Sequence, residues 1–316
     1  MPIYKIHHVT RYEYDAPVRE SVNEIRLFPY ICKEQETLRH DIVITGSPKV
    51  EIYTDYWKNI TGSFNLLYAH QLMTIESKLF IQTKLSPGFS INFESGFEML
   101  ERETASNMQL MELSLPEQIV LTDIITQIIS TAPSVQSVAK VVEYFSGYIF
   151  KNFKYVKDVT NAGTTVDDVL KHMGGVCQDF AHVLLQILRI LHIPARYVSG
   201  YICPNKNGMR GEGATHAWVE AWIPEQGWTG IDPTNNTWVS NAHVKLAVGR
   251  HFQDCTPAKG TFKGPAKQTL SVYVSVGYED GHIFEELHNV NMEVQTSDAP
   301  EKTELPDYSA QQQQQQ

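Results

Sequence analysis

The stretch from Gly174 to Tyr201, GGVCQDFAHVLLQILRILHIPARYVSGY, constrains the fold more than any other part of the chain. After Cys177 the apolar residues recur at steps of three and four, which is the spacing of one buried helical face. The two leading glycines are expected to let the chain turn sharply into this helix. Pro194 is expected to end it near His192 or Ile193. The stretch therefore predicts a helix with one buried face that leads into a strand, and it places Cys177 at or just before the first helical turn.

A cysteine at the start of a helix has a distinctive chemical environment. The first helical turn leaves backbone N–H groups unpaired and carries the positive end of the helix dipole, so it favours an anion. The thiolate is the nucleophilic form of cysteine. Position alone leaves two roles open for Cys177, a reactive thiol and a small thiol packed in the core.

A second stretch, Thr215–Pro233 with the sequence THAWVEAWIPEQGWTGIDP, favours the reactive thiol. Its first half alternates with period two, and a second short strand ends at Pro233, so the stretch predicts a hairpin. The hairpin carries His216 on one strand and Asp232 on the next. Cysteine, histidine and aspartate are the parts of a thiol nucleophile, its base and the group that orients the base.

The register of this hairpin decides whether Asp232 can orient His216. Residues that are directly opposed or diagonal across an antiparallel pair lie on the same face of the sheet. Both arrangements require either an odd number of loop residues or a bulge. A register that pairs Ile223 with Trp228 would turn Asp232 to the other face. The triad hypothesis therefore predicts an odd loop or a bulge between the two strands.

These two stretches resemble the transglutaminase-like superfamily, in the bacterial branch that has an N-terminal β domain and is suspected of cysteine protease activity. GRHFQDCTPAKGTFKG supports the resemblance, and HHVTRYEYDAPV near the start adds weaker support. Residues 145–265 match well and most of the rest loosely. The resemblance implies an α+β fold with a papain/transglutaminase-like catalytic core. In that core the cysteine lies at a helix N-terminus packed on an antiparallel sheet. The papain-type signature around the cysteine is absent, so papain itself is not implied.

Carried over residue by residue, the resemblance makes Cys177 the nucleophile, His216 the base and Asp232 the orienting group. The backbone N–H of Cys177 is the first candidate donor to a tetrahedral intermediate. The candidates for a second donor are the side chains of Tyr155 and Gln178. We expect Asp179, two residues after the cysteine, to cap the helix and support the site. We expect His182, five residues after the cysteine, to be a core or supporting histidine and not the base.

Changes in pattern along the chain divide it into four segments. Residues 1–105 are expected to form an N-terminal β-rich domain that covers one side of the catalytic sheet. Residues 106–262 form the predicted catalytic core, and residues 263–298 are predicted strands that complete one sheet or the other. Residues 299–316 form a polar tail rich in glutamine, in which we expect disorder.

Composition limits the possible partners and cofactors. The 316 residues carry a formal net charge of −10, which argues against a partner nucleic acid held through its phosphates. No apolar run is long enough to span a membrane, and the first residues lack the apolar core of a signal peptide. The four cysteines show no metal-ligand spacing, and thiol chemistry needs no cofactor. We therefore expect a cytoplasmic protein without metal or cofactor, whose oligomeric state the sequence leaves open.

The resulting functional hypothesis is a cysteine protease or amidase. The Cys177 thiolate would attack a peptide or carboxamide carbonyl to form an acyl-enzyme, and the substrate would be a peptide or a protein glutamine side chain. Water would complete hydrolysis, whereas a lysine amine would complete transamidation, and the residues leave this choice open. We favour hydrolysis because the bacterial branch is more often suspected of it. An acyltransferase with a small-molecule donor and a non-catalytic binding module that retains the fold are further alternatives.

Overall fold

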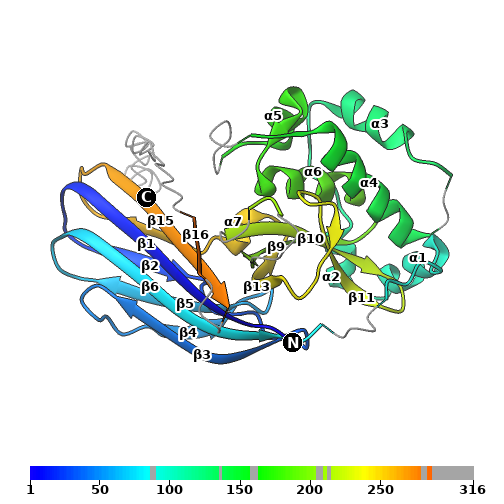
Figure 1. Cartoon of the computed structure of the whole chain (residues 1–316). Helices are drawn as coiled ribbons and strands as arrows, with labels where there is room; N and C mark the ends of the chain where they lie inside the picture. Colours follow the sequence, from blue (N-terminus) through cyan, green and yellow to red (C-terminus); the bar gives the residue numbers. More distant parts are fainter. Residues whose placement is uncertain are drawn as a thin grey trace, which may run out of the picture.

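The computed structural model describes residues 1–85, 90–134, 137–156, 163–203, 209–211 and 215–278, together with the backbone of 283–286. Two antiparallel sheets, built mainly from N-terminal strands, lie on one side of the molecule (Figure 1). A third sheet with helices packed on it lies on the other side. The fold is therefore α+β, with a strand-rich N-terminal region and a separate mixed core, as the sequence predicted.

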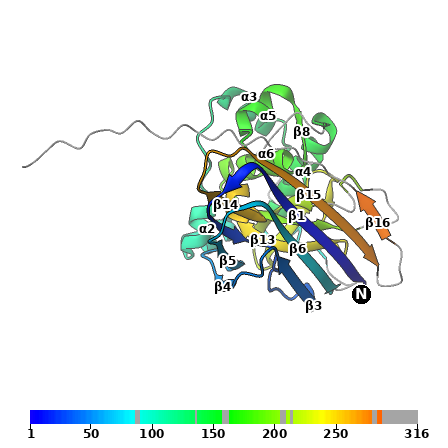
Figure 2. The same ribbon diagram turned by 90° about the vertical axis from the view of Figure 1, so that its left-hand side faces the viewer.

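The first sheet has five strands in the order β16-β15-β1-β6-β3. These strands are β1 (Ile3–Val18), β3 (Gln35–Ile44), β6 (His70–Thr83), β15 (Gln268–Tyr278) and β16 (Ile283–Glu286). In β1 the residues alternate between buried and less buried positions, as expected for a strand with one face on a core. Seen from the strand side, β6, β1 and β15 run next to one another (Figure 2).

The second sheet has four strands in the order β14-β2-β5-β4. These strands are β2 (Ser21–Ile25), β4 (Glu51–Thr54), β5 (Ile60–Leu66) and β14 (Ala258–Phe262). Apolar side chains from both sheets form one buried cluster, which includes Ile6, Ile25, Phe64 and Ile75. The two sheets therefore form a sandwich that shares its interior.

The third sheet, which we call the catalytic sheet, has the order β12-β11-β10-β9-β13. Its strands are β9 (Ala195–Ile202), β10 (Thr215–Ile223), β11 (Gly227–Asp232), β12 (Thr237–Trp238) and β13 (His243–Gly249). The helices are α1 (Phe97–Ala105), α2 (Met108–Leu113), α3 (Thr122–Ser130), α4 (Val138–Asn152), α5 (Val166–His172), α6 (Cys177–Ile190) and α7 (Phe252–Cys255). Two short strands, β7 (Lys154–Tyr155) and β8 (Gly174–Gly175), pair in parallel just before α6.

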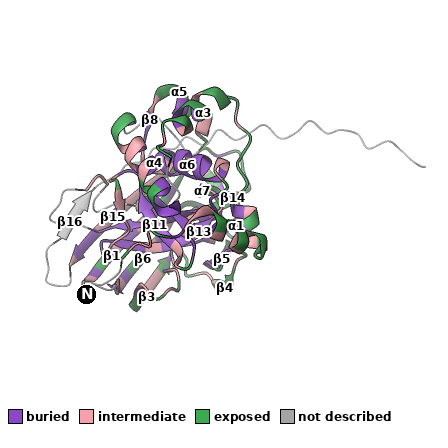
Figure 3. Ribbon diagram, turned by 90° about the vertical axis from the view of Figure 1, so that its right-hand side faces the viewer, coloured by how far each residue is buried: buried purple, intermediate pink, exposed green. Residues whose placement is uncertain are grey.

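Helix α6 is the centre of this core. It packs against β9 and β10 on one side and against α4 and α5 on the others. Its residues are buried along most of its length, whereas α3 buries few residues (Figure 3). The helix ends at Ile190, slightly earlier than predicted, because His192 adopts a left-handed conformation with φ of 57°. Its first residue is Cys177, which agrees with the prediction that this residue lies at or just before the first turn.

The opposite face of the catalytic sheet packs against the N-terminal β region. Trp218 and Val248 of the sheet join Trp57 in one buried cluster, while other residues of β9 and β13 join the interior of the sandwich. The side chain of Asn59 reinforces this contact with two hydrogen bonds to the backbone of Val248. Its Nδ2 donates to the Val248 carbonyl and its Oδ1 accepts from the Val248 N–H, both at 2.8 Å. The N-terminal region therefore covers one face of the catalytic sheet, as expected.

The strands after the core return to the N-terminal region. β14 pairs with β2, and β15 pairs with β1 along eleven consecutive residue pairs. β15, in the predicted C-terminal segment, completes one sheet of the N-terminal sandwich, whereas β14 joins the other sheet from within residues 106–262, the segment assigned to the catalytic core. The predicted polar tail, residues 299–316, lies outside the described residues.

Within the described ranges, no helix combines the length and the apolar character needed to cross a bilayer.

Replacing Asn59 by alanine should weaken the contact between the N-terminal region and the catalytic sheet. The substitution removes both hydrogen bonds to Val248 and leaves a buried N–H and a buried carbonyl without partners. We expect the free energy of unfolding in urea to fall by about 2–3 kcal/mol. Asn65→Ala, at an exposed position of β5, is the matched control and should change it by less than about 0.5 kcal/mol. Equal effects of the two substitutions would contradict the assignment.

Candidate active site

The β10–β11 hairpin has the register that the triad hypothesis requires. Ile223 pairs with Gly227, so the loop consists of residues 224–226, and its odd length is as predicted. The tight loop relies on left-handed backbone at Glu225 and Gly227. In this register Asp232 is a diagonal neighbour of His216 on the same face. Nε2 of His216 donates a hydrogen bond to Oδ2 of Asp232 at 2.8 Å.

Cys177 is the first residue of α6. The Asp179 carboxylate accepts a hydrogen bond from the backbone N–H of Val176 at 2.7 Å, so Asp179 caps the helix start as predicted. The sharp turn before the helix was expected at the two glycines but occurs at Met173, which has φ of 49°. Gly175 is instead needed for close packing, because a Cβ there would lie 2.4 Å from Oδ2 of Asp179.

The thiol of Cys177 interacts with the imidazole of His216. Nε2 of that ring is held by Asp232, and among the described residues Nδ1 makes no hydrogen bond, so Nδ1 is the nitrogen available to the sulfur. Burial of the ring opposes its protonation, but the charges of Asp232 and Cys177 outweigh burial and raise the pKa of His216 to about 10. At neutral pH His216 is therefore an imidazolium, and it places a positive charge beside Cys177.

Asp232 is fully buried, and its environment favours the carboxylate. Its Oδ1 accepts from the N–H of Thr234 at 2.9 Å, and its Oδ2 accepts from the side-chain amide of Asn235 at 2.7 Å. Nε2 of His243 lies 3.5 Å from Oδ2. Burial alone would raise the pKa of Asp232, but His216 and then His243 hold it far below its usual range. Asp232 therefore stays ionised and can accept the hydrogen bond that orients His216.

His243 and Asn235 were not singled out from the sequence. Nδ1 of His243 accepts from the N–H of Ser240 at 3.3 Å, which leaves Nε2 as the nitrogen directed at Asp232. The available signal was weak: His243 is a polar residue at the start of a mostly apolar strand, and Asn235 lies in a turn rich in polar residues. Neither pattern distinguishes a residue that contacts the triad from an ordinary polar residue.

Residues 209–211 lie close to the histidine and are tied to the same network. Asn235 accepts from the N–H of Arg210 at 2.7 Å, and its amide donates to the Arg210 carbonyl at 3.2 Å. The Arg210 guanidinium stacks 4.5 Å from the ring centre of Phe150 on α4. A Cβ on Gly211 would lie 3.1 Å from Nδ1 of His216, so only glycine leaves this side of the ring uncrowded.

Two stacked rings, of buried Tyr197 and half-buried His182, support the helix side of the site. Tyr197 stacks on His182, with ring centres 5.1 Å apart. Burial, followed by the charges of Cys177, Cys255 and Asp179, raises the pKa of Tyr197 far above its usual value, so it stays a neutral phenol. Burial, followed by nearby cationic groups, lowers the pKa of His182 to about 4. His182 accepts from the N–H of Phe252 at 3.2 Å, which fits the supporting role expected for it.

Tyr155 and Gln178 are near the nucleophile in the fold. Tyr155 pairs with Gly175 through the β7–β8 contact, and its ring packs against Phe180 with centres 6.2 Å apart. Gln178 directly follows Cys177 in the first turn of α6 and is half-buried. Their proximity keeps both as candidates for the second oxyanion donor, a role that stays a prediction.

Only the cysteine of this constellation is open to substrate. The side chains of His216 and Asp232 have no solvent exposure, whereas Cys177 is partly exposed. In the part of the chain that the structure describes, no three histidine, cysteine or acidic side chains are grouped as metal ligands. The arrangement can therefore present the Cys177 sulfur as a nucleophile, with His216 and Asp232 buried behind it to transfer a proton.

Comparisons with known proteins agree with this geometry. The description "Transglutaminase-like superfamily" matches residues 124–233, and "Bacterial transglutaminase-like N-terminal region" matches residues 4–82. An uncharacterised protein of Mycobacterium tuberculosis is 30% identical over 278 residues, covering 81% of this chain and 86% of that protein. A protein-glutamine gamma-glutamyltransferase of Pseudomonas aeruginosa is 43% identical over 75 residues, covering 22% of this chain and 11% of that protein.

Among solved structures, a "putative cysteine protease" from Cytophaga hutchinsonii has the same fold. Its TM-score is 0.68 at 19% identity, covering 91% of this chain and 94% of that one. A helix that starts with a thiol beside a histidine of an antiparallel sheet defines the papain-like class of thiol proteins. Within that class, this chain belongs to the transglutaminase-like superfamily, in the bacterial group with its own N-terminal region. Family and fold together indicate an enzyme with thiol-dependent chemistry.

Cys177 should be alkylated selectively by iodoacetamide at pH 7. Cys203 and Cys255 are buried, and burial raises the pKa of both thiols far above the usual value. Burial, with a further contribution from Glu34, raises the pKa of Cys32 to about 11. Mass spectrometry should show Cys177 reacting about tenfold faster or more than Cys32. Unfolding in urea should make the four rates similar, and similar rates in the folded protein would contradict the assignment.

Asp232→Asn should change how stability depends on pH between 7 and 10. His216 has a raised pKa in the folded protein, so folding binds a proton in this range, and stability should fall as pH rises through about 10. The slope is at most about 1.4 kcal/mol per pH unit. Without the carboxylate the pKa of His216 drops and this slope should largely disappear in urea unfolding. Asp123→Asn, at an exposed position of α3, should keep the wild-type slope.

Proposed function

We propose that this protein hydrolyses peptide or carboxamide bonds through a thioester on Cys177, with His216 as the base and Asp232 as the orienting group. The observation that carries the proposal is the buried His216–Asp232 pair, whose imidazole interacts with the thiol at the start of α6 and whose Nδ1 is not held by the carboxylate. The partly exposed sulfur is where a substrate carbonyl can reach the group.

In the first half of the reaction the Cys177 thiolate attacks the carbonyl carbon of the amide. The negative charge that develops on oxygen is met by the backbone N–H of Cys177, which has no acceptor within the helix. Tyr155 or Gln178 supplies the second hydrogen bond. His216 then gives its Nδ1 proton to the leaving amine as the C–N bond breaks, and the acyl group stays on sulfur.

In the second half a nucleophile resolves the thioester. Water loses a proton to Nδ1 of His216 as it attacks, the C–S bond breaks, and a carboxylic acid leaves. Transamidation is the second candidate, because a primary amine in place of water gives a new amide. The short match to a protein-glutamine gamma-glutamyltransferase supports this alternative. Both routes use the same three residues and require no cofactor.

The proposed substrate is a peptide, or a protein that presents a glutamine side chain. We further propose that the protein acts in the cytoplasm, and the four free thiols are compatible with that setting. The chain carries ten more acidic than basic side chains, which supports a substrate other than nucleic acid.

The decisive experiment compares wild type with Cys177→Ala on a library of glutamine-containing peptides, with and without a primary amine, read by mass spectrometry. Cleaved or deamidated products that need Cys177 and appear without amine would support hydrolysis. Amine adducts that need Cys177 would replace hydrolysis by transamidation. If no product depends on Cys177 in either condition, the hydrolase proposal fails for this class of substrate, and the non-catalytic binding module becomes the better description.

A further inference from the structure

A second histidine, His243, lies beside the Asp232 carboxylate with an unused hydrogen-bond donor. Its Nε2 is 3.5 Å from Oδ2 of Asp232, which is longer than a hydrogen bond. The His243 side chain has no solvent exposure, and its Nε2 makes no hydrogen bond with any described residue. Because buried polar groups in folded proteins almost always have partners, an unused group at this position requires a physical reason.

The hydrogen bonds around His243 assign its tautomer. Nδ1 accepts from the backbone N–H of Ser240 at 3.3 Å, so the proton of the neutral ring is on Nε2. The ring also packs edge-to-face against Trp218, with ring centres 5.3 Å apart, and both contacts restrict its orientation. His243 therefore offers a donor to Asp232 in the neutral form of its ring as well as in the charged form.

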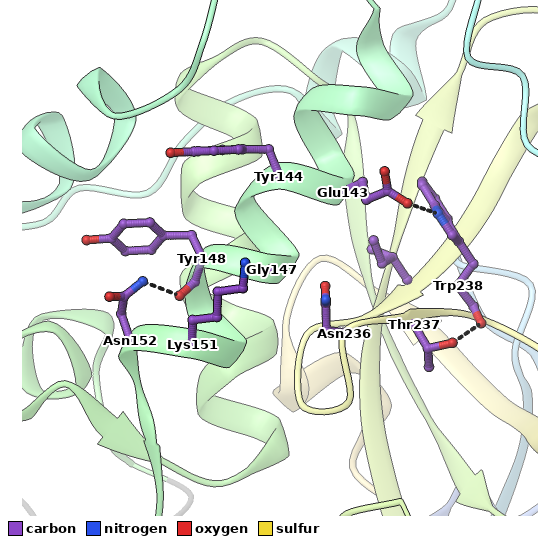
Figure 4. Close-up of a pocket in the computed structure, with 10 residues that line it drawn as sticks. Glu143, Tyr144, Gly147, Tyr148, Lys151, Asn152, Asn236, Thr237 and Trp238 are labelled. Carbon is purple, nitrogen blue, oxygen red and sulfur yellow. Dashed lines mark hydrogen bonds between the residues drawn. The ribbon is translucent and has the colours of Figure 1, made fainter. Parts of the chain in front are cut away.

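Two other donors to the carboxylate come from a turn that is held against helix α4. Thr234 and Asn235, in the turn after β11, donate to the carboxylate at 2.9 and 2.7 Å. The next residue, Asn236, lies beside α4, and Trp238 of β12 donates to Glu143 of that helix at 3.0 Å (Figure 4). The two donors of this turn are therefore fixed in place and already at hydrogen-bond distance.

The charge opposite Asp232 changes during the proposed reaction. Before substrate binds, the carboxylate faces the His216 imidazolium, whose Nε2 donates to it at 2.8 Å. Once His216 has given its Nδ1 proton to the leaving amine, the ring still donates from Nε2 but is neutral, and Cys177 carries an uncharged acyl group. A carboxylate without solvent contact then lacks the cation with which it was paired. This state is unfavourable unless hydrogen-bond donors share the negative charge.

The titratable groups that act on this pair come from four elements of the core. Besides burial, Asp232 is affected by His216 of β10 and His243 of β13, and His216 is affected by Asp232 of β11 and Cys177 of α6. Arg210 is tied to the same network through its backbone, but its guanidinium stacks on an aromatic ring of α4. Of these groups, His243 is the one that holds an unused donor next to the carboxylate.

We propose that His243 is a positioning residue that closes onto Asp232 when His216 loses its proton. Its Nε2 then donates to Oδ2 at about 2.8 Å, which keeps the carboxylate ionised and His216 neutral. The second half of the proposed reaction requires a neutral His216, because Nδ1 must accept a proton from the attacking water. The proposal rests on the proposed function for its place in the reaction, whereas the hydrogen bond itself can be measured without a substrate.

The test uses full-length Cys177→Ala, which has no ionisable group at position 177 and in this respect resembles the acyl-enzyme. The titration of His216 is followed by NMR on protein labelled at histidine, and the signal is assigned by its loss in a second protein that also carries His216→Gln. His243→Asn keeps an acceptor for the N–H of Ser240 but removes the donor to Asp232. We expect this variant to raise the midpoint of the His216 titration by about one pH unit or more, because the carboxylate then retains the imidazolium as its partner.

Two further variants separate this role from a merely structural one. His243→Gln, whose side-chain amide can donate to Asp232, should bring the midpoint back toward that of the parent. His70→Asn is the matched control, because it replaces another buried histidine, in β6 of the N-terminal sandwich, and should leave the midpoint unchanged. Simple loosening of the site would weaken the His216–Asp232 pair and lower the midpoint. A midpoint that falls or stays constant in folded His243→Asn would therefore overturn the proposal.

A measurement on Cys177→Ala alone covers the case in which His243→Asn does not fold. As the pH rises through the His216 midpoint, the Nε2 proton of His243 should move downfield because its hydrogen bond shortens, and a constant position would contradict the proposal. If both titrations behave as expected but wild type forms no Cys177-dependent product, the hydrolase proposal fails and the role of His243 toward Asp232 stands. If products form and the His216 midpoint does not depend on His243, the positioning proposal fails and the hydrolase stands.

Discussion

The structure depends most on the buried pair of His216 and Asp232. An isolated charge without solvent contact is unfavourable, so each of these groups requires the other, and the carboxylate also requires the amide of Asn235 and the N–H of Thr234. These partners come from a strand and from the turn that follows the next strand. The short hairpin loop keeps the two strands in register, and without that register the charges would face opposite sides of the sheet.

The same constraint explains why the N-terminal region is part of the enzyme and not a separate attachment. Helices α4 and α6 pack on one face of the catalytic sheet, and the other face contains large apolar side chains such as Trp218, which also meet Leu113 of α2. That face is closed by Trp57 and by the amide of Asn59, which pairs with β13. β13 begins with His243, the second histidine beside the carboxylate. The cover therefore also stabilises the strand that supports the site.

Much of this arrangement could be predicted from the sequence because it depends on local patterns. Helical spacing after Cys177 and strand alternation around His216 fixed the two elements, and the required register followed from their numbering. The contacts made by His243, by Asn235 and by the segment at Gly211 could not be predicted, since they bring together residues from separate strands and turns. The turn at Met173 was missed because a left-handed methionine leaves no signal in the sequence.

The pairing of β1 has a consequence for how the protein is made. β1 lies between β6 and β15, so one of its two hydrogen-bonding edges is filled by residues that are translated after the whole catalytic core. During synthesis the first strand therefore waits with an open edge while the core emerges, and an open strand edge is a template for mispairing. The edge closes only when β15 arrives, so the sheet that contains the first strand cannot be completed until the catalytic core has been synthesised.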